Sequence, residues 1–246
     1  MEFTSNTIRF KYNLFQEVTL IIGPSLTLKT SILFNESLKT CLEVDNGHVI
    51  FITSERKAKQ RKPLETQFIS FSTPKIEFDN LHFKYFDPLQ GSAPVFSYLS
   101  KLHLLPRQPH LIVFDDFSLF METFEQKARC INLLESCRSQ ASIVHNFNHT
   151  QTQQEDMDSF SSSSSSEEET DEVPICRVLV ADALNDLGEY RDMAALSPSI
   201  RGCWVTRSIS NNNFRLERSD IASPSTAILY EVKGNKMIQR ENGAGK

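Results

Sequence analysis

The sequence lacks long apolar runs and paired cysteine motifs, and these absences narrow the class of protein that it encodes. No stretch approaches the roughly 18 apolar residues that a membrane helix needs, and the first residues lack the basic-then-apolar layout of a signal peptide. The five cysteines are an odd number without a CxxC pair, which argues against a disulfide framework and a zinc site. We therefore expect a soluble protein of the cytoplasm or nucleus, with no membrane partner.

Basic residues are missing from one segment, Asn148–Val173, which contains eight acidic residues and the serine run Ser161–Ser166. The whole chain has 26 basic and 31 acidic residues, for a net charge of -5. Without this segment, 26 basic residues face 23 acidic ones, so the remainder is mildly basic. Too few large apolar side chains are present to offset the entropy of ordering. We predict a disordered surface insertion here.

Apolar, β-branched runs followed by helical patterns dominate the first half of the chain. Such near-continuous runs are typical of central parallel strands that are covered on both faces. The predicted strands are Glu17–Ile22, His48–Thr53 and His110–Asp115, with a shorter fourth strand at Ala141–Asn146. The predicted helices are Lys29–Leu42, Pro94–Leu105 and a longer one that contains Phe120, Phe124, Ile131 and Leu134. This alternation indicates βαβ units around a mostly parallel sheet.

The last part of the chain changes to short alternating runs. Pro174–Leu196 is predicted to be a helix. A tight turn is predicted at Gly234–Asn235, just before Lys236. The runs predicted as antiparallel strands are Arg201–Thr206, Phe214–Arg218 and Ala227–Lys233. We predict one α/β domain whose parallel sheet ends in an antiparallel meander. Residues 1–147 form its first part, residues 148–173 the insertion and residues 174–246 the remainder.

The segment Gly23–Thr30 has the form G-x-x-x-x-L-K-T, close to the phosphate-binding pattern G-x-x-x-x-G-K-[ST]. In that pattern a helix N-terminus and inward-facing N–H groups hold phosphates, the lysine reaches the outer phosphates and the hydroxyl holds Mg²⁺. Lys29 and Thr30 supply both groups between a strand and a helix. Leu28 stands where the second glycine is expected, at a tight point of the loop. The alternative is an ordinary strand–turn–helix with a capping lysine.

Two carboxylates are predicted at the same edge of the sheet. His110–Asp115 fits a Walker B strand, four apolar residues and then an acid, which places Asp115 beside the nucleotide and Mg²⁺. Glu55 follows the strand His48–Thr53, where a carboxylate can orient or activate an attacking water. The alternative for Glu55 is a solvated side chain that opens a charged loop.

A basic run follows Glu55 and suggests a nucleic-acid contact. Such a run binds phosphates without reading sequence, because it releases condensed counterions. Its members are Arg56, Lys57, Lys59, Arg61 and Lys62. A nuclear-import signal and a plain solvated loop are the alternatives.

Taken together, these segments resemble the small Shu-complex ATPases that associate with a SWIM-domain zinc protein and are distant paralogues of the RecA-type recombinase. The resemblance rests on Gly23–Thr30, Val49–Thr53, Ile76–Asp116, Gly202–Val205 and the strand with Lys236-Met-Ile. It implies a RecA-like P-loop fold in which Lys29 and Thr30 contact nucleotide and Asp115 is the Walker B acid.

The resemblance also implies a function. It suggests a nuclear accessory factor in homologous recombination DNA repair that binds a SWIM-domain partner as a heterodimer, the recombinase and single-stranded DNA. ATP and Mg²⁺ are the implied cofactors, and Leu28 departs from the motif, so a weak or vestigial ATPase is expected. The alternatives are a RecA-like scaffold subunit of another assembly, such as Elongator, and a small P-loop NTPase or kinase.

Overall fold

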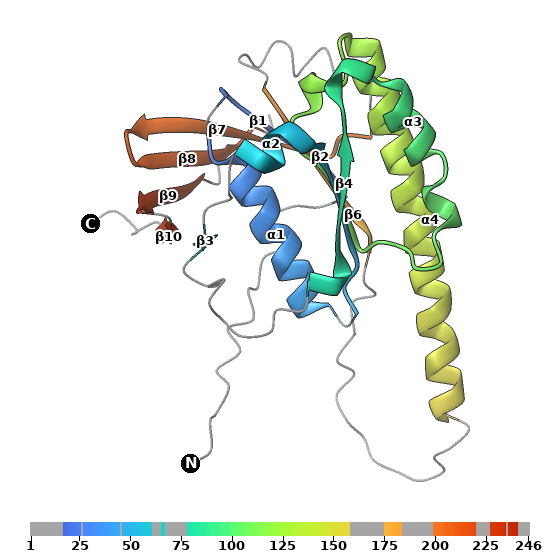
Figure 1. Cartoon of the computed structure of the whole chain (residues 1–246). Helices are drawn as coiled ribbons and strands as arrows, with labels where there is room; N and C mark the ends of the chain where they lie inside the picture. The colour runs from blue at the N-terminus through green and yellow to red at the C-terminus, as the bar shows by residue number, and fades with distance from the viewer. Residues whose placement is uncertain are drawn as a thin grey trace, which may run out of the picture.

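The fold is known from a computed structural model, which describes residues 17–25, 27–44, 46–60, 65–66, 78–157, 175–183, 199–219, 227–234 and 236–240. These residues form a ten-stranded sheet in the order β3-β10-β9-β8-β7-β1-β6-β5-β2-β4 (Figure 1). Within the described residues, no helix combines the length and apolar character required to cross a bilayer.

One half of the sheet is parallel from β4 to β7. Its strands are β1 (Val18–Ile22), β2 (Val49–Ser54), β4 (Leu81–Phe86), β5 (Leu111–Phe114), β6 (Arg177–Asp182) and β7 (Gly202–Ser210). Every side chain of β1, β2 and β5 is buried, as expected of strands covered on both faces. The strands predicted at Glu17–Ile22, His48–Thr53 and His110–Asp115 are therefore confirmed.

The other half is an antiparallel meander that runs from β7 to β10. Its strands are β8 (Asn213–Arg218), β9 (Ala227–Lys233) and β10 (Lys236–Arg240), and the short β3 (Glu65–Thr66) pairs with β10 in parallel. Gly234 in the β9–β10 turn has φ +59°, a conformation that glycine adopts at little cost. The predicted α/β fold with a terminal meander is confirmed.

Helices cover both faces of the parallel half (Figure 1). The helices are α1 (Lys29–Glu43), α2 (Glu55–Gln60), α3 (Ala93–Leu99) and α4 (Phe124–Met157). On one face, α1 packs Ile32, Leu33 and Leu38 into a core shared with Val49 and Val113. On the opposite face, α3 and α4 pack into a second core. The parallel half of the sheet therefore lies between two helical layers.

The prediction of a strand at Ala141–Asn146 is wrong, because these residues belong to α4. The buried side of α4 continues through Cys137 to Ala141, while Ile143 and Val144 are exposed to solvent. A β-branched pair on the outer side of a helix resembles part of a strand in sequence, and only packing distinguishes the two.

The fourth parallel strand is β6, which lies inside the segment predicted as a helix, Pro174–Leu196. That prediction is wrong for Arg177–Asp182, since β6 is buried between β5 and β1. Residues 184–196 lie outside the described residues.

The prediction of a disordered insertion at Asn148–Val173 is wrong for its first residues. α4 continues to Met157, so the first residues of that segment are helical, and residues 158–173 lie outside the described residues.

Two strands also differ from expectation: β4 was not predicted, and β7 pairs in parallel with β1 before it starts the meander.

Candidate phosphate-binding site

The loop after β1 requires glycine at its first position. Gly23 has φ +147°, and a Cβ atom there would lie 2.2 Å from Oγ1 and 2.5 Å from the carbonyl oxygen of Thr206. The Thr206 hydroxyl in turn donates to the carbonyl oxygen of Ile22 at 3.1 Å. Strand β7 therefore passes against the loop so closely that only glycine fits.

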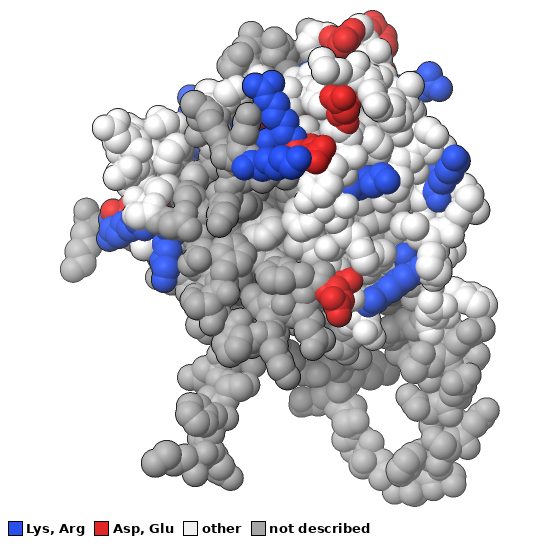
Figure 2. All heavy atoms as spheres, viewed as in Figure 1, with Lys and Arg blue, Asp and Glu red and all other residues white. Residues whose placement is uncertain are grey.

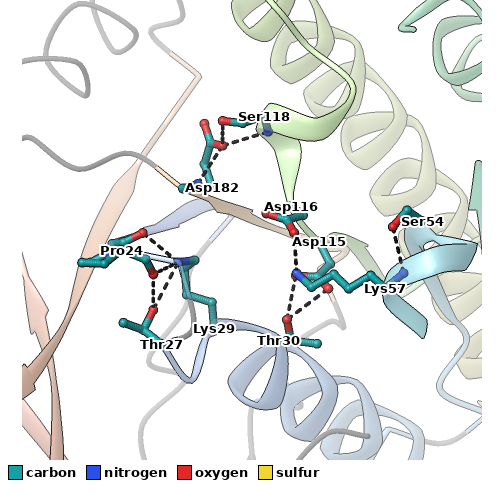
Figure 3. A network of polar contacts seen from close by, with 12 residues as sticks. Pro24, Thr27, Lys29, Thr30, Ser54, Lys57, Asp115, Asp116, Ser118 and Asp182 are labelled. Carbon is teal, nitrogen blue, oxygen red and sulfur yellow. Dashed lines mark hydrogen bonds and ion pairs between the residues drawn. The ribbon is translucent and has the colours of Figure 1, made fainter. Parts of the chain in front are cut away.

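Lys29 opens α1 and turns back across the loop (Figure 3). Its ammonium donates to the carbonyl oxygens of Gly23 at 2.7 Å and Pro24 at 2.6 Å, and to the Thr27 hydroxyl at 3.1 Å. Burial lowers the pKa of Lys29 to about 8, although the nearby carboxylates oppose the change. A buried cation thus sits at the mouth of the loop, held by carbonyl groups that a phosphate oxygen can replace as acceptor.

Leu28 precedes α1 without the strain expected at a glycine position. Its φ of -67° is open to any residue, and its side chain is buried in the core that also contains Ile32. The backbone at this point therefore does not need the second glycine of the pattern. Leu26 lies outside the described residues.

Thr30 and Asp115 meet across the sheet edge, as the sequence predicts. The Thr30 hydroxyl lies 3.1 Å from Oδ1 and 3.2 Å from Oδ2 of Asp115 (Figure 3). Asp115 follows β5 and is 1% exposed. Burial raises the pKa of its carboxyl group, and the Lys57 ammonium and the Thr30 hydroxyl oppose the rise. The prediction that Gly23–Thr30 lies beside the end of the Asp115 strand is confirmed.

Lys57 lies in this site, although the sequence assigned it to a DNA-binding run. Its ammonium is 2.9 Å from a carboxylate oxygen of Asp115 and 2.9 Å from one of Asp116. Its backbone N–H donates to the Ser54 hydroxyl at 3.2 Å, which fixes the start of α2. In this arrangement the Lys57 ammonium pairs with both aspartates.

Asp116 reaches Lys57 from an unusual backbone conformation. Its φ and ψ of 66° and 58° are left-handed, which aspartate tolerates better than most residues. Such conformations are often found at functional sites.

A second ion pair lies at the end of β6, and the sequence analysis missed it. Lys127 of α4 lies 2.7 Å from Asp182, which is 0% exposed. Asp182 also accepts from the backbone N–H groups of Ser118 and Ala183, both at 2.9 Å, and from the Ser118 hydroxyl. An acid after the apolar run Val178–Ala181 repeats the signal that identified Asp115, but the helix prediction for this segment hid it.

The remaining predicted residues lie outside this cluster. Glu55 is 64% exposed and pairs with Lys59, which is 74% exposed, at 2.6 Å. Arg56 is also exposed, and basic side chains gather over α2 on the face shown in Figure 2. Arg61 and Lys62 lie outside the described residues.

The site can be tested against the implied cofactors. The oxygens of Thr30, Asp115 and Asp116 are ligands of the type that Mg²⁺ prefers. Their arrangement does not fit the ion, because an oxygen of each carboxylate already holds the Lys57 ammonium. Among the described residues, no group of three or more His, Cys, Asp or Glu side chains is placed to hold a metal ion. Lys29 at the mouth of the loop and the N-terminus of α1 behind it are groups of the type that hold a phosphate.

No protein-family model matches the chain, and no curated protein matches it. The function of the chain is therefore inferred from the geometry of the site and from the resemblance seen in the sequence.

Proposed function

We propose that this chain is a RecA-like P-loop module that binds the phosphates of ATP at Gly23–Thr30 and acts as an accessory factor in homologous recombination. The observation that carries the phosphate site is the contact between Thr30 and Asp115. It unites the hydroxyl and the acid of the two nucleotide-binding motifs at the carboxyl edge of a parallel sheet, where ligands of open α/β folds bind.

The strand arrangement supports the RecA-like assignment. The loop strand β1 lies near the middle of the whole sheet, β6 separates it from the acid strand β5, and the sheet continues beyond β7 as a meander. Both motif strands therefore end in the same crevice. The chain's own residues then have clear roles: Lys29 exchanges its loop carbonyls for phosphate oxygens, and the N-terminus of α1 faces the same anion.

Binding is favoured over rapid hydrolysis. Glu55, the residue predicted to orient water, is largely exposed and paired with Lys59. Asp115 is engaged by Thr30 and Lys57. The proposed activity is therefore that of a binding module with weak or vestigial ATPase.

ATP binding by the isolated chain tests this proposal. Lys29→Ala is expected to weaken ATP affinity at least tenfold, a loss of about 1.4 kcal/mol or more. Lys101→Ala, which removes an exposed lysine outside the site, is the control and is expected to bind like the wild type. Equal ATP affinity of the wild type and Lys29→Ala would favour the alternative, an ordinary strand–turn–helix with a capping lysine. Phosphate release well above background in the wild type would favour an NTPase.

The partners are proposed from the resemblance alone: a SWIM-domain zinc protein in a heterodimer, a RecA-type recombinase and single-stranded DNA, in the nucleus. Co-expression with a SWIM-domain zinc protein, followed by size-exclusion chromatography, tests the heterodimer directly. Purification from cells with mass spectrometry separates the alternatives, since an acetyltransferase assembly among the captured proteins would favour an Elongator-type scaffold.

A further inference from the structure

Lys57 occupies the place next to Thr30 and Asp115 that a P-loop protein gives to its divalent cation. The ammonium contacts one oxygen of Asp115 and one of Asp116, while the Thr30 hydroxyl contacts both oxygens of Asp115, including the one that holds the ammonium (Figure 3). An ion that joins the hydroxyl to the carboxylates would have to share these oxygens with the lysine.

The lysine is built into this position. Its own N–H is held by Ser54 at the end of β2, and β2 pairs with β5, so the start of α2 is fixed beside the end of the Asp115 strand. The left-handed backbone of Asp116 brings a second carboxylate to the same ammonium. The Ser54 contact and the backbone conformation of Asp116 therefore both serve to hold the Lys57 ammonium at this position.

The pair differs from an ordinary surface ion pair in its burial. Lys57 is 21% exposed and Asp115 is 1% exposed, whereas the two partners in the neighbouring pair of Glu55 and Lys59 are both well exposed. A carboxylate as buried as Asp115 needs a counter-ion, and among the described residues Lys57 makes the ion pair with it. A divalent ion would have to expel this ammonium and then remain next to it, since α2 keeps the lysine in reach.

We propose that Lys57 is a tethered cation that takes the place of Mg²⁺, so that this site binds a polyphosphate such as ATP without a divalent metal. This inference rests on the proposed function, because it concerns the cation of the same phosphate site. Lys29 and Lys57 then supply the positive charge for the phosphates from the loop side and from the α2 side.

The first test uses metal alone, so that it is independent of nucleotide. Thermal unfolding is measured with and without millimolar Mg²⁺ for the wild type, Lys57→Met and Lys59→Met. We expect no shift for the wild type and for the control Lys59→Met. In Lys57→Met the aspartates no longer hold an ammonium, and Mg²⁺ should raise the midpoint by roughly 2–4 °C. A shift of the same size in the wild type would overturn the proposal.

The second test measures ATP affinity in Mg²⁺ and in EDTA. The wild-type values should agree within about twofold, while Lys57→Met should lose about tenfold in EDTA and regain affinity in Mg²⁺. Lys57→Arg, which keeps the charge, should remain independent of metal. A wild-type affinity that rises tenfold or more with Mg²⁺ would refute the tethered cation, and this comparison needs no variant. If no variant binds ATP, the nucleotide function fails, while the metal-alone test still decides the role of Lys57.

Discussion

The ammonium of Lys127 and the carboxylate of Asp182 form a buried ion pair of 2.7 Å that ties α4 to the end of the central strand β6. Because Asp182 also accepts hydrogen bonds from Ser118 and Ala183, its charge is fully compensated within the fold. The pair therefore connects the helical layer to the strand between the two motif strands.

Breaking this pair is expected to destabilise the protein strongly. Asp182→Asn or Lys127→Met leaves an uncompensated buried charge, and each should lower the free energy of unfolding by about 3–5 kcal/mol. The combined Lys127→Met and Asp182→Asn variant should lose less than the two single changes together. Urea unfolding measures these values. Glu55→Gln, which breaks an exposed pair, is the control and should cost about 0–1 kcal/mol; a similar cost for Asp182→Asn would contradict the prediction.

The central strands were predictable because their residues form near-continuous apolar runs. Glu17–Ile22 and His110–Asp115 required little more than this signal and the turn residues after them. Ile143 and Val144 show its limit, because the same residue types lie exposed on α4. Burial on both faces, which defines β6, depends on neighbours that are distant in the sequence.

The candidate site was predictable as far as its motifs extend. Thr30 and Asp115 were expected to meet because each follows a parallel strand of the same sheet. Lys57 was assigned to a DNA-binding basic run because its neighbours have the same charge, and only the pairing of β2 with β5 brings it to the aspartate. Local composition therefore predicted the loop but not the counter-ion of Asp115.

Gly23 should be far more sensitive to substitution than Gly234. Gly23→Ala places Cβ against the Thr206 backbone, so about 2–3 kcal/mol of stability should be lost, together with ATP binding. Gly234 has a positive φ, but among the described residues other than its chain neighbours no atom lies within 4 Å of an added Cβ, so Gly234→Ala should cost only about 1–2 kcal/mol and keep ATP binding. Urea unfolding and ATP titration compare the two. Retained ATP binding in Gly23→Ala would argue against close packing of the loop.

A histidine cluster at the opposite edge of the sheet should make the stability depend on pH. Burial lowers the pKa of His110 to about 4, and the charges of His145, Arg107 and His48 act in the same direction. The unfolded chain takes up this proton near the ordinary pKa of about 6.5, and the folded chain only near 4. The stabilisation is therefore complete above pH 6.5 and declines as the pH falls towards 4.

The variant His110→Asn isolates this contribution. The Nδ1 atom of His110 accepts from the backbone N–H of His48 at 3.1 Å, and an asparagine oxygen can accept the same bond without titrating. Between pH 7 and pH 4.5 the wild type should lose about 2 kcal/mol more unfolding free energy than His110→Asn. Equal losses in urea titrations at both pH values would show that His110 does not titrate in this range.

Single-stranded DNA binding should depend on the exposed part of the basic run and not on Lys57. Arg56 and Lys59 are exposed residues of α2, and Arg61 and Lys62 follow them in the sequence. Changing these four residues to glutamine should weaken binding and reduce the slope of log affinity against log salt concentration. For single strands the slope changes by about 0.7 for each lost phosphate contact.

Lys57 provides the internal comparison for this titration. Because its ammonium is held by Asp115 and Asp116, Lys57→Gln alone should leave the salt slope of DNA binding unchanged. Lys84→Gln, which removes an exposed lysine of β4, controls for the loss of a positive charge elsewhere. A filter-binding titration decides whether Lys57 contacts DNA. A salt slope that changes in Lys57→Gln would mean that the lysine leaves the aspartates to contact DNA. An unchanged slope in the fourfold variant would exclude α2 as the DNA-binding surface.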